Sequence, residues 1–355
     1  MAPEHLSNRQ LNRATLARQM LLERIAMTPY EAVRDLVGLQ AQTPQSWYLS
    51  LWSRLSDFDP VATGRLIEER RLVRIPVMRS TIHLVTDDDA LLLRSFTQPS
   101  IDRSLRGVWA RRLEGIDLRA ITDEVLAFVG EAPHTPTDLL EHLDARWPGV
   151  DRVTMANAVR ALVPLVQAPP RGVWRRSGAV KLAALEAWIG RAAPAKSDPE
   201  SIVRRYLGAF GPAAVMDAQA WSGVTRLGEV FERLRPTLVT FSDDAGRELF
   251  DLPDAPRPDP DTPAPVRFIG QWEAVLLVHA RRALVLPEEH RKKVFAVTIP
   301  QSVPTFLVDG QVAGTWRFAK DTGDVTWEPF EPLPDTVSAD VAAEAERLAE
   351  FHRSG

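Results

Sequence analysis

The sequence predicts an α+β fold of three tandem winged-helix units followed by a small C-terminal β-barrel. Up to residue 252, stretches with apolar residues at helical spacing alternate three times with pairs of short, strand-like runs, and helices followed by a two-stranded hairpin make a winged helix. Beyond residue 265, short strand-like runs dominate the pattern. We therefore expect winged-helix units at residues 1–117, 118–195 and 196–264, the last including a proline-rich linker, and a β-barrel with a closing helix at residues 265–355.

The first unit contains clear helix boundaries. Ser7 is a suitable N-cap for the first helix, and Thr28 with Pro29 marks the start of the second. Gly38 should end that second helix, and two strands should turn near Arg79. The elements expected here are helices over residues 6–26, 29–37 and 60–71 and strands over residues 72–77 and 81–85.

A segment with two glutamines follows the second helix. Gln40 and Gln42 are separated by Ala41, so in an extended backbone their carboxamides would lie on one side of the chain. Pro44 opens the next amphipathic run, which places the glutamines in a connection between two helices, where functional groups are often held by a rigid scaffold. From the pattern alone, two loop amides bonded to nearby backbone are the simpler interpretation.

The same order of elements returns twice, although the sequences do not repeat. In the second unit we expect helices over residues 119–129, 136–143 and 152–162 and a hairpin of residues 165–167 and 180–182, with its tip at residues 169–176. In the third unit we expect helices over residues 199–207, 212–221 and 225–234 and a hairpin of residues 237–241 and 247–250.

The last part of the chain should be mostly β-structure, as a small β-barrel or a curled sheet. Residues 252–265 are rich in proline and suit a linker or an extended wrap. Asp309-Gly310 is a strong hairpin signal, and residues 321–324 form a second turn signal. The expected strands are residues 266–269, 283–286, 295–299, 305–308, 313–317 and 325–327, and the closing helix is residues 338–351.

Composition limits the class of protein. The 355 residues are 45% hydrophobic and 25% charged, as in a soluble globular protein of two to four units. The absence of cysteine excludes disulfides, thiolate zinc sites and a cysteine nucleophile. No apolar run approaches the length of a membrane span and the N-terminus has no signal-peptide pattern, so we expect a cytoplasmic protein.

The motifs of common enzyme classes are missing from the sequence. The seven histidines show no metal-ligand spacing, and there is no glycine-rich phosphate loop that leads into a helix and no Gly-x-Ser-x-Gly motif. We therefore expect neither a metal nor a cofactor. The net charge of −4 does not indicate a nucleic-acid partner, but a basic face at the second hairpin is compatible with it.

Several motifs, in order, resemble one family of bacterial enzymes. The sequence Gly38-Leu39-Gln40-Ala41-Gln42 is followed by Met78-Arg79-Ser80-Thr81-Ile82-His83-Leu84, and three later stretches add to the resemblance: residues 206–213, 220–223 and 308–316. Together they resemble the winged-helix DNA glycosylases of the AlkZ and YcaQ type over almost the whole chain. That resemblance implies a C-shaped protein that curves around duplex DNA.

The resemblance also implies a chemistry for the two glutamines. The family cleaves the N-glycosidic bond of alkylated purines, including bulky N7 adducts and interstrand crosslinks left by natural-product toxins. Gln40 and Gln42 match the Gln-x-Gln form of the family motif, whereas the YcaQ branch has aspartate at the second position. We therefore expect these two carboxamides to be the catalytic residues, which position a water near the sugar.

Five basic residues are expected to bind DNA. Arg79 and His83 flank the first hairpin turn, and Arg171, Arg175 and Arg176 lie at the tip of the second; all five could contact the DNA backbone. His83 is equally compatible with a half-buried strand histidine. Aromatic residues beside these positions are expected to be core residues: Trp47, Tyr48 and Trp174.

One position departs from the family pattern. The family more often has an acidic residue where Trp272 or Glu273 lies, and the sequence does not decide which of the two corresponds. We expect a monomer that acts on double-stranded DNA with alkylated purines, near the nucleoid and without a membrane. The alternatives are a winged-helix DNA-binding regulator without catalysis and a protein that sequesters a toxin.

Overall fold

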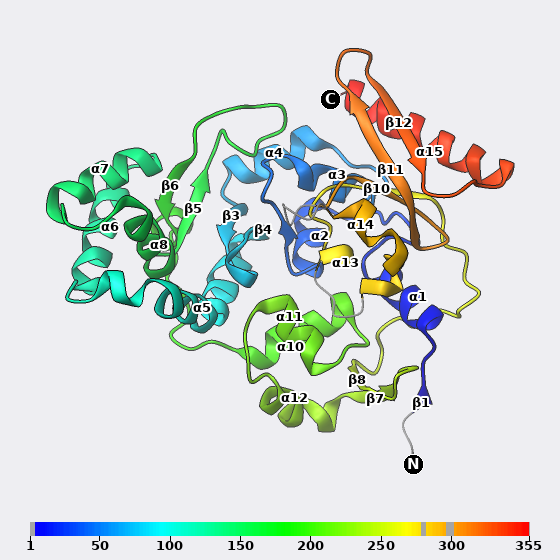
Figure 1. Ribbon diagram of the computed structural model, residues 1–355, viewed down its shortest axis with the longest axis horizontal. Coiled ribbons are helices and arrows are strands. Elements are labelled where there is room, and N and C mark those ends of the chain that lie inside the picture. The colour runs from blue at the N-terminus through cyan, green and yellow to red at the C-terminus, as the bar shows by residue number, and fades with distance from the viewer. Residues whose placement is uncertain (1–3, 278–281, 296–301, 355) are drawn as a thin grey trace.

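A computed structural model describes residues 4–277, 282–295 and 302–354. It is a mixed α/β structure. Residues 29–86 of the first predicted unit lie at the centre, with the second unit, the third unit and the C-terminal part arranged around them, whereas the N-terminal strand and helix lie at the edge beside the third unit (Figure 1). Within the described ranges, no helix is both long enough and apolar enough to cross a membrane.

The helices and strands of the first unit begin where the sequence indicates. Ser7 and Thr28 each form a capping box with the residue three positions on, and Asp59 caps the helix that starts at Pro60. The first helix is shorter than expected and ends at Arg18. The elements are β1 (Glu4–His5), α1 (Asn8–Arg18), α2 (Pro29–Asp35), β2 (Leu39–Gln40), α3 (Ser46–Trp52), α4 (Pro60–Glu68), β3 (Leu72–Pro76), the 3₁₀ helix η1 (Met78–Ser80) and β4 (Ile82–Thr86).

A long helix that the sequence analysis did not assign follows β4. Helix α5 (Asp87–Trp109) has 23 residues, contains Pro99, and is capped by Thr86, whose side chain accepts a hydrogen bond from the backbone N–H of Asp89. Its buried side chains pack against β3, β4 and the second unit. It therefore connects the first and second units as one continuous element, which ends in the 3₁₀ helix η2 (Ala110–Leu113).

The second and third units have the predicted order of three helices and a hairpin. In the second unit the elements are α6 (Leu118–Glu131), α7 (Pro136–Arg146), α8 (Arg152–Leu162), β5 (Leu165–Ala168), β6 (Lys181–Ala184) and the short α9 (Leu185–Ile189). In the third they are α10 (Pro199–Phe210), α11 (Val215–Ser222), α12 (Gly228–Leu234), η3 (Arg235–Thr237), β7 (Val239–Ser242) and β8 (Glu248–Asp251).

The hairpins of the first two units share one sheet. The strand order is β2-β4-β3-β5-β6, and β3 joins β5 through the pair Arg74 and Gln167. The third hairpin pairs with β1, which runs parallel to β7. The order of elements is thus as predicted, but the first two hairpins are not independent wings, and a tandem array of separate winged-helix units stays a prediction.

The C-terminal strands form an open sheet in the described part of the chain. Its order is β12-β11-β10-β9, so β12 and β9 are its edges. These described strands therefore do not close into the small β-barrel that was the first of the two expectations. Both predicted turns are present, with Asp309, Gly310 and Gly323 at positive φ. The elements are β9 (Arg267–Ile269), α13 (Ala274–Leu277), η4 (Arg282–Leu284), η5 (Glu288–His290), α14 (Arg291–Val294), β10 (Thr305–Val308), β11 (Gln311–Ala319), β12 (Asp324–Pro329) and α15 (Asp335–Ser354).

Two of the strands predicted for this region do not appear among the strands of the described residues. Residues 283–286 were expected to form a strand, but η4 and the turn after it occupy this stretch, where Val285 and Leu286 donate backbone hydrogen bonds to the Arg282 carbonyl. Burial of Val285 and Leu286 beside Leu16 of α1 accounts for their apolar character, so tertiary packing overrides strand propensity here. The expected strand 295–299 lies, apart from residue 295, outside the described residues.

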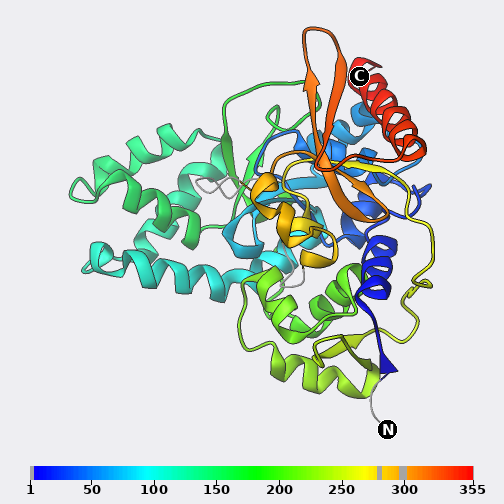
Figure 2. The ribbon, with the colours of Figure 1, turned by 45° about the vertical axis from the view of Figure 1, so that its right-hand side comes forward.

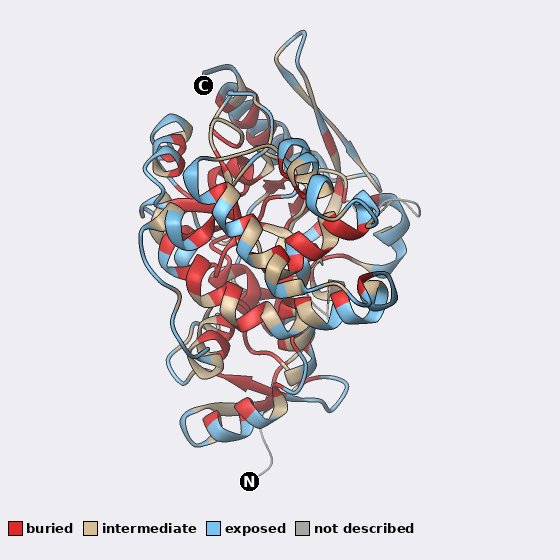
Figure 3. Cartoon of the chain, turned by 90° about the vertical axis from the view of Figure 1, so that its left-hand side faces the viewer, coloured by how far each residue is buried: buried red, intermediate tan, exposed pale blue. Residues whose placement is uncertain are grey.

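The proline-rich segment lies along α1 as an extended wrap. Arg9 and Arg13 of α1 donate to the carbonyl oxygens of Pro260 and Thr262, at 2.8 and 2.7 Å. Arg18 forms a bidentate pair with Asp251, at 2.6 and 2.8 Å, and both side chains are fully buried. A turned view shows α1 next to the third unit (Figure 2), and a view coloured by burial shows the buried residues concentrated in the interior of the molecule (Figure 3). The N-terminal helix therefore holds the third unit and the wrap together.

Candidate active site

The two glutamines follow a reversal of the chain that needs glycine. Helix α2 ends at Asp35, and Val37 and Gly38 adopt positive φ angles of 55° and 94°. A Cβ atom on Gly38 would lie 2.8 Å from Cγ1 of Val85, which is closer than real Cβ atoms approach. This reversal places β2 directly against β4, with Gln40 opposite His83.

The oxygen atoms of both carboxamides are held by hydrogen bonds. Gln40 is buried, and its Oε1 accepts from Nη2 of Arg79 at 3.1 Å. Gln42 is exposed, and its Oε1 accepts from the backbone N–H of Ile82 at 2.9 Å. Among the described residues, neither amide nitrogen has a protein partner, and each amide oxygen keeps a second lone pair. Both side chains can therefore still bind a water or a substrate group.

Arg79 connects Gln40 with the third unit. Arg79 and Ser80 have positive φ angles of 53° and 60°, a conformation that costs energy for residues with side chains. The guanidinium donates both to Gln40 and to the carbonyl oxygen of Trp221, at the end of α11. Burial lowers the pKa of Arg79 to about 10, so the group remains charged at neutral pH.

His83 lies on the same face of the sheet as Gln40. Directly opposed residues of antiparallel strands project to the same side, and these two form such a pair between β2 and β4. The ring is 4% exposed, and its Nδ1 lies 2.9 Å from the carbonyl oxygen of Thr81. Burial and then the charge of Arg79 lower the pKa of His83 to about 3, which leaves it neutral. A carbonyl only accepts, so Nδ1 carries the proton and Nε2 has the lone pair.

The comparison with known proteins decides the family. A family model described as "DNA glycosylase AlkZ-like" matches residues 33–351. The chain belongs to the AlkZ-like DNA glycosylase family. It is also 25% identical over 373 residues to a curated relative from Streptomyces sahachiroi named "Interstrand DNA cross-link repair glycosylase", covering 98% of this chain and 96% of the relative.

The fold is that of a solved member of the family. The structure of "Streptomyces sahachiroi DNA glycosylase AlkZ" matches with a TM-score of 0.79 at 22% identity, over 97% of each chain. The AlkZ-like chain described here is therefore an enzyme, a monofunctional DNA glycosylase. Family membership thus favours neither a non-catalytic DNA-binding regulator nor a toxin-sequestering protein.

The three arginines of the second hairpin lie on the loop between β5 and β6. This loop is bound to Gln45, the N-cap residue of α3, which accepts from the backbone N–H of Arg175 at 3.2 Å and donates to the carbonyl oxygen of Arg176 at 3.2 Å. Arg175 also donates to the carbonyl oxygen of His352, Arg176 pairs with Glu68, and Arg171 donates to the Gly178 carbonyl oxygen at 3.3 Å. The loop is thus brought beside the glutamine segment, with part of its basic character paired within the protein.

The aromatic residues of the AlkZ-like chain lie where the sequence predicted. Trp47 and Tyr48 are fully buried and stack at 3.7 Å between ring centroids. Trp174 packs against Tyr48 and Phe351, which confirms it as a packing residue under the loop.

Trp272 contacts the glutamine segment, which the sequence alone did not indicate. Nε1 of Trp272 donates to Oγ1 of Thr43 at 2.9 Å, and its φ angle is 67°. Glu273 is buried and forms a bidentate pair with Arg54, at 3.1 and 2.9 Å, and also accepts from Ser50. Glu273 therefore attaches the C-terminal part to the first unit, and Trp272 is the neighbour that reaches the site. In the sequence, the departure from the family pattern at Trp272 or Glu273 was the feature that could have pointed to this contact.

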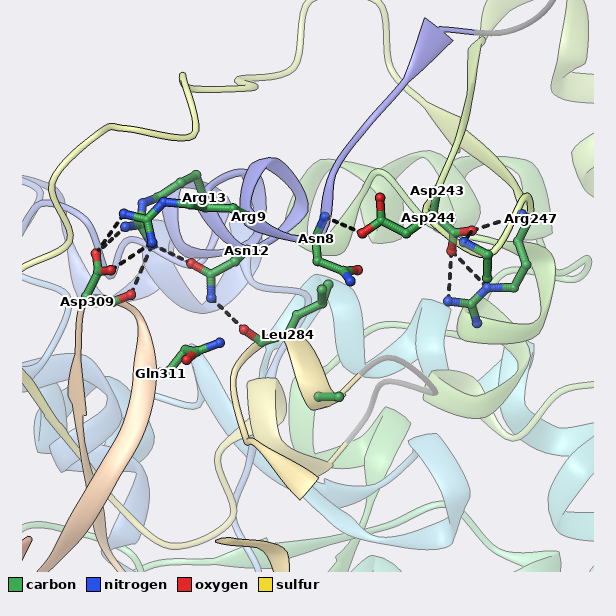
Figure 4. A pocket seen from close by; sticks show the side chains of 12 residues that line it. Asn8, Arg9, Asn12, Arg13, Asp243, Asp244, Arg247, Leu284, Asp309 and Gln311 are labelled. Atoms are coloured by element: carbon green, nitrogen blue, oxygen red, sulfur yellow. Dashed lines mark hydrogen bonds and ion pairs between the residues drawn. The ribbon is translucent and has the colours of Figure 1, made fainter. Parts of the chain in front are cut away.

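Two pockets adjoin the elements described above. One, of about 390 Å³, lies between the first and second units and has Gln42, Ser80 and Ile82 on its wall. The other, of about 540 Å³, lies between α1, the third hairpin and the C-terminal sheet (Figure 4). Its arginines are mostly paired with Asp243 and Asp309, so its charges are balanced within the protein. Over the residues that the structure describes, no group of three or more His, Asp or Glu side chains could hold a metal ion.

Proposed function

We propose that this DNA glycosylase hydrolyses the N-glycosidic bond of N7-alkylated purines in double-stranded DNA, including bulky adducts and interstrand crosslinks. The name of the relative from Streptomyces sahachiroi, an interstrand DNA cross-link repair glycosylase, supports this range of lesions. The enzyme would act as a monomer at the nucleoid, either in DNA repair or in self-resistance to a genotoxic natural product.

The chemistry of such lesions suits a site without a strong acid. An N7-alkylated purine is cationic, so breaking its bond to C1′ returns the electron pair to the ring and makes the leaving base neutral. The sugar passes through an oxocarbenium-like state. The protein needs to hold a water near C1′ and to present electronegative atoms to the developing positive charge.

Gln40 and Gln42 would perform both tasks. The main support for this proposal is that the two carboxamides lie on one short segment of a chain that belongs to a glycosylase family. Arg79, in the turn before β4, holds the oxygen of Gln40, and the backbone of β4 holds the oxygen of Gln42. A fixed carboxamide needs little reorganisation during the reaction. The second lone pair of each oxygen, or the free amide N–H groups, would then orient the attacking water.

DNA binding would come from the residues around this segment. Arg171, Arg175 and Arg176 lie on a loop beside it, and cations on such a loop favour phosphate contacts. Arg79 and His83 are less suited to a direct phosphate contact, because the guanidinium of Arg79 already has two protein partners and His83 is neutral. The expectation from the sequence that these two residues contact DNA is tested with the Arg79 and His83 variants described below.

The proposal is tested by single-turnover release of N7-methylguanine from duplex DNA. Wild type, Gln40→Ala and Gln42→Ala are compared with Gln311→Ala, which changes an exposed glutamine at the start of β11, and DNA affinity is measured in parallel. We expect normal DNA binding in all four proteins, and loss of activity only in the first two variants. Wild-type protein that binds DNA but releases neither this base nor bulkier N7 adducts would contradict the proposed substrate.

A further inference from the structure

The reaction proposed above leaves one proton without an acceptor. When a water molecule bonds to C1′, one of its protons must leave before a stable sugar hydroxyl results. Carboxamides are hydrogen-bonding groups but not bases at neutral pH, so Gln40 and Gln42 cannot take that proton. Since Arg79 is charged, it cannot take it either. A neutral base next to the glutamines would complete the site.

His83 has the position of such a base. It is the cross-strand partner of Gln40, and residues in this relation have Cβ atoms about 4.5–5.5 Å apart on one face of the sheet. The bond from Nδ1–H to the Thr81 carbonyl fixes both the ring orientation and the tautomer. Among the described residues, Nε2 has no hydrogen-bond partner, so the lone pair is available.

We propose that His83 is a further catalytic residue, whose Nε2 accepts the proton of the water that Gln40 and Gln42 position. This assignment rests on the proposed function. In the reaction, the C1′–N9 bond breaks with its electron pair moving to the cationic purine, and the water oxygen bonds to C1′. One proton of that water passes to Nε2, and the imidazolium then releases it to solvent. The products are a neutral alkylpurine, an abasic site and one proton.

The surroundings of His83 keep this base neutral. Arg79 is the charged group that acts on it among the described residues, and it disfavours protonation. Its neighbours Gln40, Ile75 and Thr81 are uncharged. With a pKa of about 3, the imidazole is a weak base, but a sugar-bound, protonated hydroxyl is a far stronger acid than imidazolium. The transfer to Nε2 is therefore downhill, and the free base is present at every working pH.

The test uses single-turnover base release by wild type, His83→Phe, His83→Gln and His83→Ala, with DNA affinity and thermal unfolding measured for each. Removal of a general base costs about 10²- to 10⁴-fold in rate, and we expect a loss in this range in all three variants with DNA affinity within a few-fold of wild type. Added imidazole should restore part of the activity of His83→Ala. The restored rate should rise with pH as imidazole loses its proton, whereas the wild-type rate should be flat between about pH 5 and 8. Furan, a ring of similar size without a basic nitrogen, should restore nothing.

The outcomes separate this assignment from the other roles of His83 and from the proposed function. Folded His83→Phe or His83→Gln with a rate constant close to that of wild type would overturn it. Rescue of His83→Ala by furan as well as by imidazole would indicate a packing role, and lost DNA affinity with an unchanged rate constant at saturation would indicate a phosphate contact; either result overturns the assignment. Failure of wild-type protein to release any N7-alkylpurine would instead contradict the proposed function.

Discussion

Arg79 should act on Gln40 rather than directly on DNA, and this can be measured with a double-mutant cycle. Its guanidinium donates to Oε1 of Gln40 at 3.1 Å and to the carbonyl oxygen of Trp221. Arg79→Met keeps the length of the side chain and removes the donors. A hydrogen bond from a charged group is worth about 1.5–3 kcal/mol, which corresponds to roughly a 10- to 150-fold change in rate if the bond is needed in the transition state.

The cycle compares single-turnover rate constants of wild type, Arg79→Met, Gln40→Ala and the double variant. We expect each single variant to lose activity and the double variant to lose little more than the worse of the two, because the arginine acts through the glutamine. DNA affinity should change little. Additive losses, together with a weaker salt dependence of DNA binding in Arg79→Met, would refute this reasoning, since a lost phosphate contact reduces the salt slope by about one.

Three further predictions concern the stability of the folded protein, and Gly107→Ala serves as a control for the first. In a urea titration, Gly38→Ala should lower the free energy of unfolding by about 1–3 kcal/mol, because φ is 94° and the new Cβ would meet Val85. Gly107→Ala, with open space around it in α5, should raise the free energy of unfolding by about 0.5–1 kcal/mol. Asp251→Asn should cost about 3–5 kcal/mol in the same measurement by breaking a fully buried pair with Arg18, and a loss below about 1 kcal/mol would contradict the burial of that pair. The pKa of His83 is lowered from 6.5 to about 3, so on acidification the unfolded chain takes up this proton before the folded protein does. The stability that the neutral His83 contributes is therefore complete above pH 6.5 and is lost as the pH falls toward 3. Acidification from pH 7.5 to 5 should therefore destabilise wild type by about 2 kcal/mol more than His83→Phe, as judged by urea unfolding at both pH values.

The sequence predicted the local elements well where caps and turn residues define them. Thr28 with Pro29, and Asp309-Gly310, mark boundaries through the chemistry of a single residue or pair, and the structure has those boundaries. Helix α5 was overlooked because it follows a strand without a loop and contains Pro99. Its cap at Thr86 and the three aspartates in its first turn were the usable signals.

Relations between distant segments could not be predicted from local patterns. The pairing of Arg74 with Gln167 that merges two hairpins into one sheet depends on how two units pack, and no local signal encodes it. The same holds for residues 283–286, where burial against α1 and not strand pairing explains the apolar run. The glutamines themselves were found through a family motif. The hydrogen bonds that the Trp221 carbonyl and the Trp272 side chain form beside them became apparent only in the three-dimensional structure.

The geometry of the glutamine segment depends on every part of the chain. The third unit holds Gln40 through Arg79, because the Trp221 carbonyl at the end of α11 binds the same guanidinium. The second unit holds Ala41 indirectly: Arg74 donates to the Ala41 carbonyl oxygen at 2.8 Å, and a Cβ atom on Gly172 of the β5–β6 loop would lie 2.9 Å from Cδ of Arg74.

The C-terminal part holds the same segment from its other end. Trp272 bonds to Thr43, one residue beyond Gln42, and Glu273 is buried against α3, the helix that follows. Near the segment, Arg74 is buried and Arg79 is half-buried, and among the described residues neither has a carboxylate partner. Burial lowers the pKa of both arginines to about 10. Burying such charges is costly, and the hydrogen bonds that they form fix the positions of Gln40 and Ala41. A stable fold does not need this arrangement, and we expect its function to be the rigid placement of Gln40 and Gln42, the two proposed catalytic carboxamides.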